Sequence, residues 1–164
     1  MSSRELYIKP IDLKRHLLFR AIFNTLFPEL KETLNETIAR VVSEYYVKPQ
    51  DIYTVYNSLL QAGLVRQVIK TLNPKMLEEC IEKTKAEQAE KRGRRKSEES
   101  IHRECLEKAG YVIEYEITEY GIVEYCSLVK QQLKAYKDGI IALSPKVRMI
   151  FDKCMEYLVK EEGV

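Results

Sequence analysis

The sequence predicts a mainly α-helical protein that contains one small β-hairpin. Over most of the 164 residues, apolar side chains recur at three- and four-residue spacing, which is typical of amphipathic helices. Only residues 64–70 and 112–117 have the β-branched or alternating pattern of strands. Hydrophobic residues make up 45% of the chain, which is enough for a packed core.

The first predicted helix begins near Pro10 and ends before Pro28, because proline is tolerated in a first turn but interrupts a helix interior. One apolar stripe runs along this helix. Beside it lies a second stripe at four-residue spacing, formed by Phe19, Phe23 and Phe27. A helix that is apolar on two faces is either central in a core or packed against a partner chain.

Two more helices and a turn follow. Asn35 is the expected N-cap of the second helix. Residues 47–51 predict a turn, since Pro49 fixes its own φ and disfavours helical backbone at Lys48. The third helix is expected over residues 49–62 and ends at Gly63, where a positive φ is tolerated.

Residues 74–110 differ from the rest of the chain because they are rich in Lys, Glu, Arg and Gln and poor in large apolar side chains. Two weak apolar stripes predict a helical hairpin whose tip, residues 91–96, is basic. The tip is interpreted in three ways: as a solvated turn, as a contact to the DNA backbone, or as a contact to an acidic partner. After the second strand, we expect one helix over 119–137 and a last helix that begins at Ser144 and Pro145.

This pattern divides the chain into three segments. Residues 1–73 contain the N-terminal helices and the first strand, residues 74–110 are an inserted hairpin, and residues 111–164 contain the second strand and the C-terminal helices. The first segment is mildly basic, with ten Lys or Arg against seven Asp or Glu. The third is mildly acidic, with seven against nine.

Several function classes are disfavoured. No stretch has the roughly 18 apolar residues of a membrane span, and the N-terminus lacks an apolar signal core, so we expect a cytoplasmic protein without membrane contact. The 32% of charged residues and the absence of Trp favour a thermophile's surface. No Gly-rich phosphate loop or nucleophile set is present, so neither an enzyme nor a cofactor is expected.

The four cysteines are widely spaced and include no CxxC pair. We therefore expect them to be reduced, buried and apolar rather than metal-bound. Cys105 and His102 share one helix face, but no nearby residue completes a ligand set, so no metal site is expected.

The order helix, helix, turn, helix, strand, strand, helix is that of winged helix-turn-helix domains, whose third helix enters the DNA major groove. The expected fold is therefore a winged helix-turn-helix with an inserted helical hairpin and C-terminal helices. The outward side chains of the third helix can hydrogen-bond base edges or phosphates, although a merely solvated face is the alternative. They are Gln50, Tyr53, Thr54, Asn57, Ser58 and Gln61. Candidate phosphate contacts are Lys48, Arg66, Lys70, Arg92, Arg94, Arg95 and Lys96.

Residues 47–66 resemble the recognition-helix segment of PadR-like winged-helix transcription regulators. The matching positions are Tyr53, Tyr56, Leu59, Gly63 and Leu64. Residues 115–121, Tyr-Glu-Ile-Thr-Glu-Tyr-Gly, resemble the second part of the same motif, which is also similar in MarR-like regulators. Together the two parts cover about 27 residues. The resemblance implies a sequence-specific double-stranded DNA-binding regulator, a repressor, that acts as a homodimer.

The chain departs from this family in one respect, because about 45 residues separate the two parts of the motif where the family has a short wing. Either a hairpin is inserted into the wing, or the chain holds two tandem units, the second with a recognition-like helix over residues 97–109. Residues 59–65 and 106–112 echo each other and support the tandem arrangement. The shortage of large apolar residues in 74–110 favours the insertion.

A homodimer would need an interface. The candidates are the phenylalanine stripe and the last helix, with Val147, Ile150, Phe151 and Leu158, although both stripes are equally interpretable as core. The alternative function is a winged-helix module that binds proteins, or a subunit of a larger complex without specific DNA readout, because the fold alone does not determine function.

Overall fold

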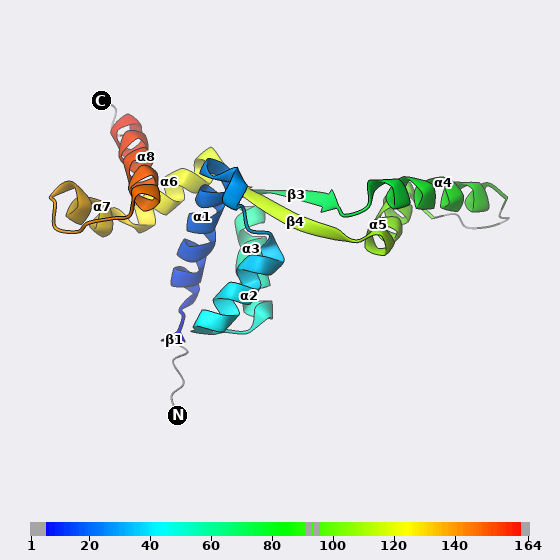
Figure 1. Cartoon of the computed structure of the whole chain (residues 1–164), viewed down its shortest axis with the longest axis horizontal. Helices are drawn as coiled ribbons and strands as arrows, with labels where there is room; N and C mark the ends of the chain where they lie inside the picture. Colours follow the sequence, from blue (N-terminus) through cyan, green and yellow to red (C-terminus); the bar gives the residue numbers. More distant parts are fainter. Residues whose placement is uncertain (1–5, 91–92, 94–95, 162–164) are drawn as a thin grey trace. The chain divides into compact units, whose positions relative to one another are not determined.

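The computed structural model describes residues 6–90, 93 and 96–161 (Figure 1). Over these residues the chain forms eight α-helices, one short 3-10 helix and two two-stranded sheets, so the prediction of a mainly α-helical protein with a small β-hairpin is confirmed. The contacts divide the chain into two compact units. Unit 1 comprises Met1–Gln67 with Tyr115–Val164, and unit 2 comprises Val68–Glu114.

The N-terminal half of unit 1 contains three helices, α1 (Pro10–Leu26), α2 (Leu34–Glu44) and α3 (Pro49–Gln61), with the 3-10 helix η1 (Pro28–Leu30) after α1. The predicted N-cap of α2 was wrong, because Thr33 and not Asn35 caps it. The Thr33 side chain accepts a hydrogen bond from the Glu36 N–H, and the Glu36 carboxylate accepts one from the Thr33 N–H. This capping box satisfies two backbone donors and starts the helix one residue before Asn35.

A short parallel pair joins β1 (Leu6–Tyr7) to β2 (Tyr45–Tyr46). The sequence did not predict it, because two residues are too few to show the alternation that marks a strand. The pair helps to position the start of α3, since β2 follows α2 directly and lies just before the Lys48 N-cap of α3.

The predicted hairpin is formed by β3 (Val65–Thr71) and β4 (Tyr111–Ile117). At one end the Thr118 N–H donates to the Leu64 carbonyl, and at the other the Leu72 N–H donates to the Gly110 carbonyl. The strands therefore run antiparallel along their whole length.

Unit 2 contains α4 (Pro74–Glu90) and α5 (Glu98–Ala109), which pack against each other (Figure 1). They form the helical hairpin expected over residues 74–110. Few side chains are buried in this unit, namely Gln88, Ile101, Cys105 and Leu106 among those described. A disulfide bond between Cys80 and Cys105, with Cα atoms 5.6 Å apart, joins the two helices.

The C-terminal part of unit 1 contains α6 (Glu119–Leu128), α7 (Lys130–Lys137) and α8 (Pro145–Glu161). The single helix predicted over 119–137 was wrong, because Val129 leaves the helical region at φ −111° and ψ 24° and separates α6 from α7. A second disulfide, Cys126–Cys154, joins α6 to α8. The expectation of four reduced cysteines was therefore also wrong, since each cysteine pairs with one on a helix far along the sequence.

The core of unit 1 contains several residues that the sequence offered as a dimer interface. Phe27, Ile150 and Phe151 are buried within one chain, so for these three positions the alternative interpretation as core is the correct one. Val147 is half-buried, and the side chain of Leu158 lies outside the described residues. Phe19 and Phe23 of the phenylalanine stripe are also only partly buried.

Candidate nucleic-acid interface

The two parts of the sequence motif meet in unit 1. The Thr118 hydroxyl donates a 2.6 Å hydrogen bond to the Gly63 carbonyl and accepts one from the Gly121 N–H, which caps α6. A Cβ atom on Gly121 would lie 2.0 Å from the Leu64 carbonyl oxygen, so only glycine fits there. The two parts of the motif are therefore in contact, one at the end of α3 and the other at the start of α6.

The echo between residues 59–65 and 106–112 has a local explanation. Both segments end a helix and begin a strand, and both place a glycine at positive φ, at +73° for Gly63 and +82° for Gly110. Glycine adopts this backbone at little cost. The helix expected over 97–109 as a second recognition helix is α5, which packs on α4 in unit 2. The echo thus reflects a shared way of ending a helix.

Tyr115 connects β4 to α1, α2 and α3. Its side chain is fully buried, and its hydroxyl lies 2.7 Å from the Thr37 hydroxyl on α2. Its backbone carbonyl accepts a hydrogen bond from the Asn24 amide on α1, and its ring meets the Tyr56 ring edge-on at 5.6 Å. Burial raises the pKa of Tyr115 well above its usual value and that of Tyr56 to about 12. Both phenols therefore stay neutral and keep these contacts.

The outward face of α3 carries the side chains expected to read DNA, and all six are exposed. Three of them have contacts within the chain. Thr54 donates to the Gln50 carbonyl, Ser58 donates to the Val55 carbonyl, and Tyr53 donates to the Asn35 side chain at 3.2 Å.

The amide side chains of Gln50, Asn57 and Gln61 form no hydrogen bond with any residue that the structure describes. Each amide therefore offers both a donor and an acceptor to an external partner.

The predicted phosphate contacts differ in their availability. Lys48, at the N-terminus of α3, is exposed and has no ion pair within the described ranges. Arg66 and Lys31 both donate to Glu116, at 2.8 and 3.0 Å, and these hydrogen bonds lower the pKa of the Glu116 carboxyl. Lys70 pairs with Glu114 at 3.2 Å. To bind DNA, Arg66 and Lys70 would have to exchange their carboxylate partners for phosphate oxygens.

The basic tip of the hairpin is described only in part. Lys96 is exposed and pairs with Glu104 at 2.9 Å, while its backbone N–H donates to Gln88. Arg92, Arg94 and Arg95, which were predicted to contact phosphates, lie outside the described residues.

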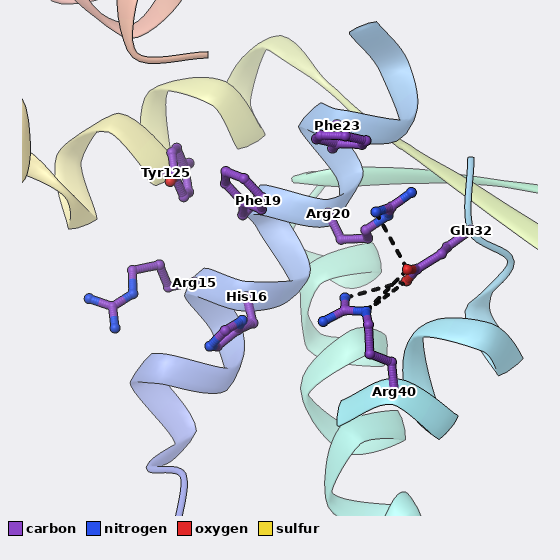
Figure 2. A pocket seen from close by; sticks show the side chains of 8 residues that line it. All are labelled: Arg15, His16, Phe19, Arg20, Phe23, Glu32, Arg40 and Tyr125. Carbon is purple, nitrogen blue, oxygen red and sulfur yellow. Dashed lines mark hydrogen bonds and ion pairs between the residues drawn. The ribbon is translucent and has the colours of Figure 1, made fainter. Parts of the chain in front are cut away.

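Sequence reasoning missed a groove of about 530 Å³ in unit 1, which we call the arginine–aromatic groove (Figure 2). One wall consists of Phe19 and Phe23 from α1 and Tyr125 from α6, with the Phe19 ring 6.0 Å from Tyr125 and 6.2 Å from Phe23. The remaining lining residues are Arg15, His16, Arg20, Glu32 and Arg40. The signal was present on α1, where Arg15, Phe19 and Phe23 recur at four-residue spacing.

Charges in the groove are partly compensated. Glu32 lies between two guanidinium groups, 3.4 Å from Arg20 and 3.1 Å from Arg40 (Figure 2). His16 Nε2 lies 3.0 Å from the Tyr45 hydroxyl, and burial together with the charges of Arg40 and Arg15 lowers the pKa of His16. The imidazole is therefore held in its neutral form near neutral pH.

Comparisons of the chain with protein-family models, with curated proteins and with solved structures found no match. Within the described part of the chain, no helix is long and apolar enough to cross a membrane, and no group of three or more His, Cys, Asp or Glu side chains is placed to hold a metal ion. A functional proposal therefore rests on the contacts and charges of the site itself.

Proposed function

We propose that this protein is a sequence-specific double-stranded DNA-binding transcription regulator of the PadR-like winged-helix type, which reads the major groove with α3. The order α1, α2, α3, β3 and β4 is that of a winged helix, with the α4–α5 hairpin inserted between the strands. The observation that carries the proposal is the exposed face of α3, on which the amides of Gln50, Asn57 and Gln61 have no partner among the described residues.

The spacing of these amides suits base readout. Asn57 and Gln61 are four residues apart and Gln50 is two turns before Asn57, so all three lie along one side of α3. An Asn or Gln amide pairs in a bidentate way with adenine N6 and N7 in the major groove, and such a pair discriminates by about 1–3 kcal/mol. A homodimer would place two such helices about one DNA turn apart on a pseudo-palindromic site.

Phosphate contacts would supply the sequence-independent part of the affinity. Lys48 is available directly, whereas Arg66 and Lys70 contribute by exchanging Glu116 and Glu114 for phosphate oxygens. Each phosphate that a cation neutralises releases counterions, so the logarithm of the affinity should fall with the logarithm of the salt concentration, with a slope of about −0.9 per contact.

The test is a site selection from random duplexes, followed by fluorescence anisotropy at several salt concentrations. Asn57→Ala and Gln61→Ala should each change the preferred bases, at a cost of about 1–3 kcal/mol on the selected site. Lys48→Gln should weaken binding to all sequences alike and reduce the salt slope by about one contact. The matched control is Gln132→Ala, an exposed amide on α7. Identical selected sites for the Asn57, Gln61 and control variants would contradict readout by α3.

A second candidate function is a protein-binding adaptor, and one observation favours it. Unit 2 exposes large apolar side chains on β3, in the bend that follows it and on α4, among them Ile69 at 46%, Leu72 at 66% and Met76 at 46%. Such patches often mark protein contacts. An adaptor would bind random duplexes weakly and without the steep salt dependence, and Leu72→Ser would impair its partner binding. A regulator would keep its DNA affinity in that variant.

A further inference from the structure

We propose that the Cys80–Cys105 disulfide of unit 2 is a redox switch, which a dithiol reductant opens in the folded protein while the Cys126–Cys154 disulfide of unit 1 stays closed. The inference concerns unit 2 alone, so it goes beyond the proposed function and does not require DNA binding. It rests on the different burial of the two disulfides, on the hydroxyl group beside Cys105, and on how few other contacts hold α4 and α5 together.

The two disulfides differ in burial. Cys126 and Cys154 are 0% and 1% exposed, and they lie between α6 and α8 in the core of unit 1. Cys105 is 1% exposed, but its partner Cys80 on α4 is only half-buried. Thiol–disulfide exchange needs a thiolate to reach one of the two sulfur atoms, so accessible disulfides are the labile and regulatory ones. Of the four cysteines, all of which the structure describes, Cys80 is therefore the one at which a reductant can begin.

The Cys105 sulfur is placed to be the leaving group. It lies 3.8 Å from the Thr84 hydroxyl on α4, and Thr84 is the donor because a disulfide sulfur carries no proton. A thiolate of the dithiol attacks Cys80 Sγ, the S–S bond breaks, and Cys105 leaves as a thiolate that accepts the Thr84 hydrogen bond until it takes up a proton.

The second thiol of the reductant completes the exchange. It attacks the reductant's own sulfur in the mixed disulfide, which releases Cys80 and leaves the reductant as a cyclic disulfide. The two electrons given up by the dithiol thus end on Cys80 and Cys105, each of which becomes a thiol.

Few contacts besides this bond hold α4 against α5. The Lys85–Glu98 ion pair between the two helices is 3.6 Å long and exposed on both sides, and such pairs contribute little. Near the other end of α4, the Gln88 side chain accepts a hydrogen bond from the Lys96 N–H. The buried side chains among the described residues of both helices are Gln88, Ile101, Cys105 and Leu106. Reduction should therefore release α4 from α5 and expose the apolar side chains between them.

Timed reduction of the folded full-length protein with dithiothreitol tests the proposal. Alkylation of acid-quenched samples and peptide mass spectrometry give the thiol fraction at each cysteine. Cys80 and Cys105 should become thiols together, while Cys126 and Cys154 stay oxidised until denaturant is added. Hydrogen exchange on the same samples should show α4 and α5 losing protection as their disulfide is reduced, and regaining it on reoxidation.

Two further measurements test the direction of the exchange. A brief exposure to the monothiol 2-mercaptoethanol should leave the mixed disulfide on Cys80 and a free thiol on Cys105. Thr84→Val should slow the reduction about threefold, because the leaving thiolate loses its hydrogen bond. Thr84→Ser keeps the hydroxyl group, so this matched control should be reduced at the wild-type rate.

Each opposite result would overturn a step of the proposal. Reduction of both disulfides at the same rate, or of Cys126–Cys154 first, would show that burial does not separate them. Full protection of α4 and α5 after reduction of Cys80–Cys105 would mean that the bond does not control the hairpin. A simultaneous loss of protection in α1 to α3 would mean that the whole chain unfolds. A mixed disulfide on Cys105 would reverse the direction of attack, and equally slow reduction of both Thr84 variants would exclude a role of the hydroxyl group.

Discussion

Gly121 is a residue at which the chain packs too closely for any side chain. An added Cβ would lie 2.0 Å from the Leu64 carbonyl oxygen and 2.5 Å from the Ile117 side chain. Alanine normally stabilises a helix relative to glycine, so a loss of stability on Gly121→Ala would point to the close packing at this position. We expect Gly121→Ala to lower the free energy of unfolding by about 1–3 kcal/mol, as overpacking does. Urea denaturation measures it, with the exposed Ser127→Ala on the same helix as control. Equal stability of the Gly121 variant and the wild type would contradict the packing.

His16 should make the stability depend on pH. Burial, and then the charges of Arg40 and Arg15, lower its pKa in the folded state. The unfolded state therefore binds a proton more readily than the folded one, so stability is complete above the unfolded pKa of about 6.5 and is lost as the pH falls below it and through the lower pKa of the folded state. The melting temperature should drop more for the wild type than for His16→Gln between about pH 7.5 and 5.5. His102→Gln, at an exposed position of α5, should follow the wild type, and parallel curves for all three proteins would refute the role of His16.

Some site residues followed from the sequence and others did not. The outward face of α3 was predictable because the period of a helix determines which side chains share a face. The partners of Arg66 and Lys31 were not, because Glu116 lies 50 and 85 positions further along the chain. No local pattern marks such pairs, and only the folded arrangement brings them together.

At the scale of the elements, the Tyr115 hydroxyl links β4 to α2. Thr37 donates its own proton to Glu32, at 2.9 Å, so Tyr115 must be the donor in the 2.7 Å contact with Thr37. Tyr115→Phe should therefore destabilise the protein by about 1–2 kcal/mol through a lost buried hydrogen bond. Thermal and urea unfolding measure this, and Tyr120→Phe, 77% exposed, is the matched control. If both variants were equally stable, the hydrogen bond between Tyr115 and Thr37 would not stabilise the protein.

The elements were predictable where proline, glycine and apolar spacing mark them, as at the start of α1, the end of α3 and the start of α8. They were not predictable where the sequence has no such mark. The break at Val129 contains neither proline nor glycine, and the apolar spacing continues across it. The Thr33 cap was readable in principle, since Thr33 and Glu36 have the spacing of a capping box.

At the scale of the whole molecule, the sequence indicated that residues 74–110 have too few apolar side chains for a core of their own. In the structure, the disulfide between Cys80 and Cys105 joins the two helices of that hairpin instead. The pairing could not be foreseen, because it depends on which helices become neighbours.

Removing each disulfide should therefore destabilise a different unit. The Cys80–Cys105 bond closes a loop with a sequence separation of 25, which corresponds to about 3–4 kcal/mol of chain entropy. The Cys80→Ser, Cys105→Ser double variant should lose hydrogen-exchange protection in α4 and α5 while α1 to α3 keep theirs, because unit 2 has few other buried side chains. The Cys126→Ser, Cys154→Ser variant is the matched control, with its loss confined to α6 and α8. Unchanged protection of α4 and α5, or free thiols on labelling of the unfolded, unreduced wild type, would contradict a disulfide-held hairpin.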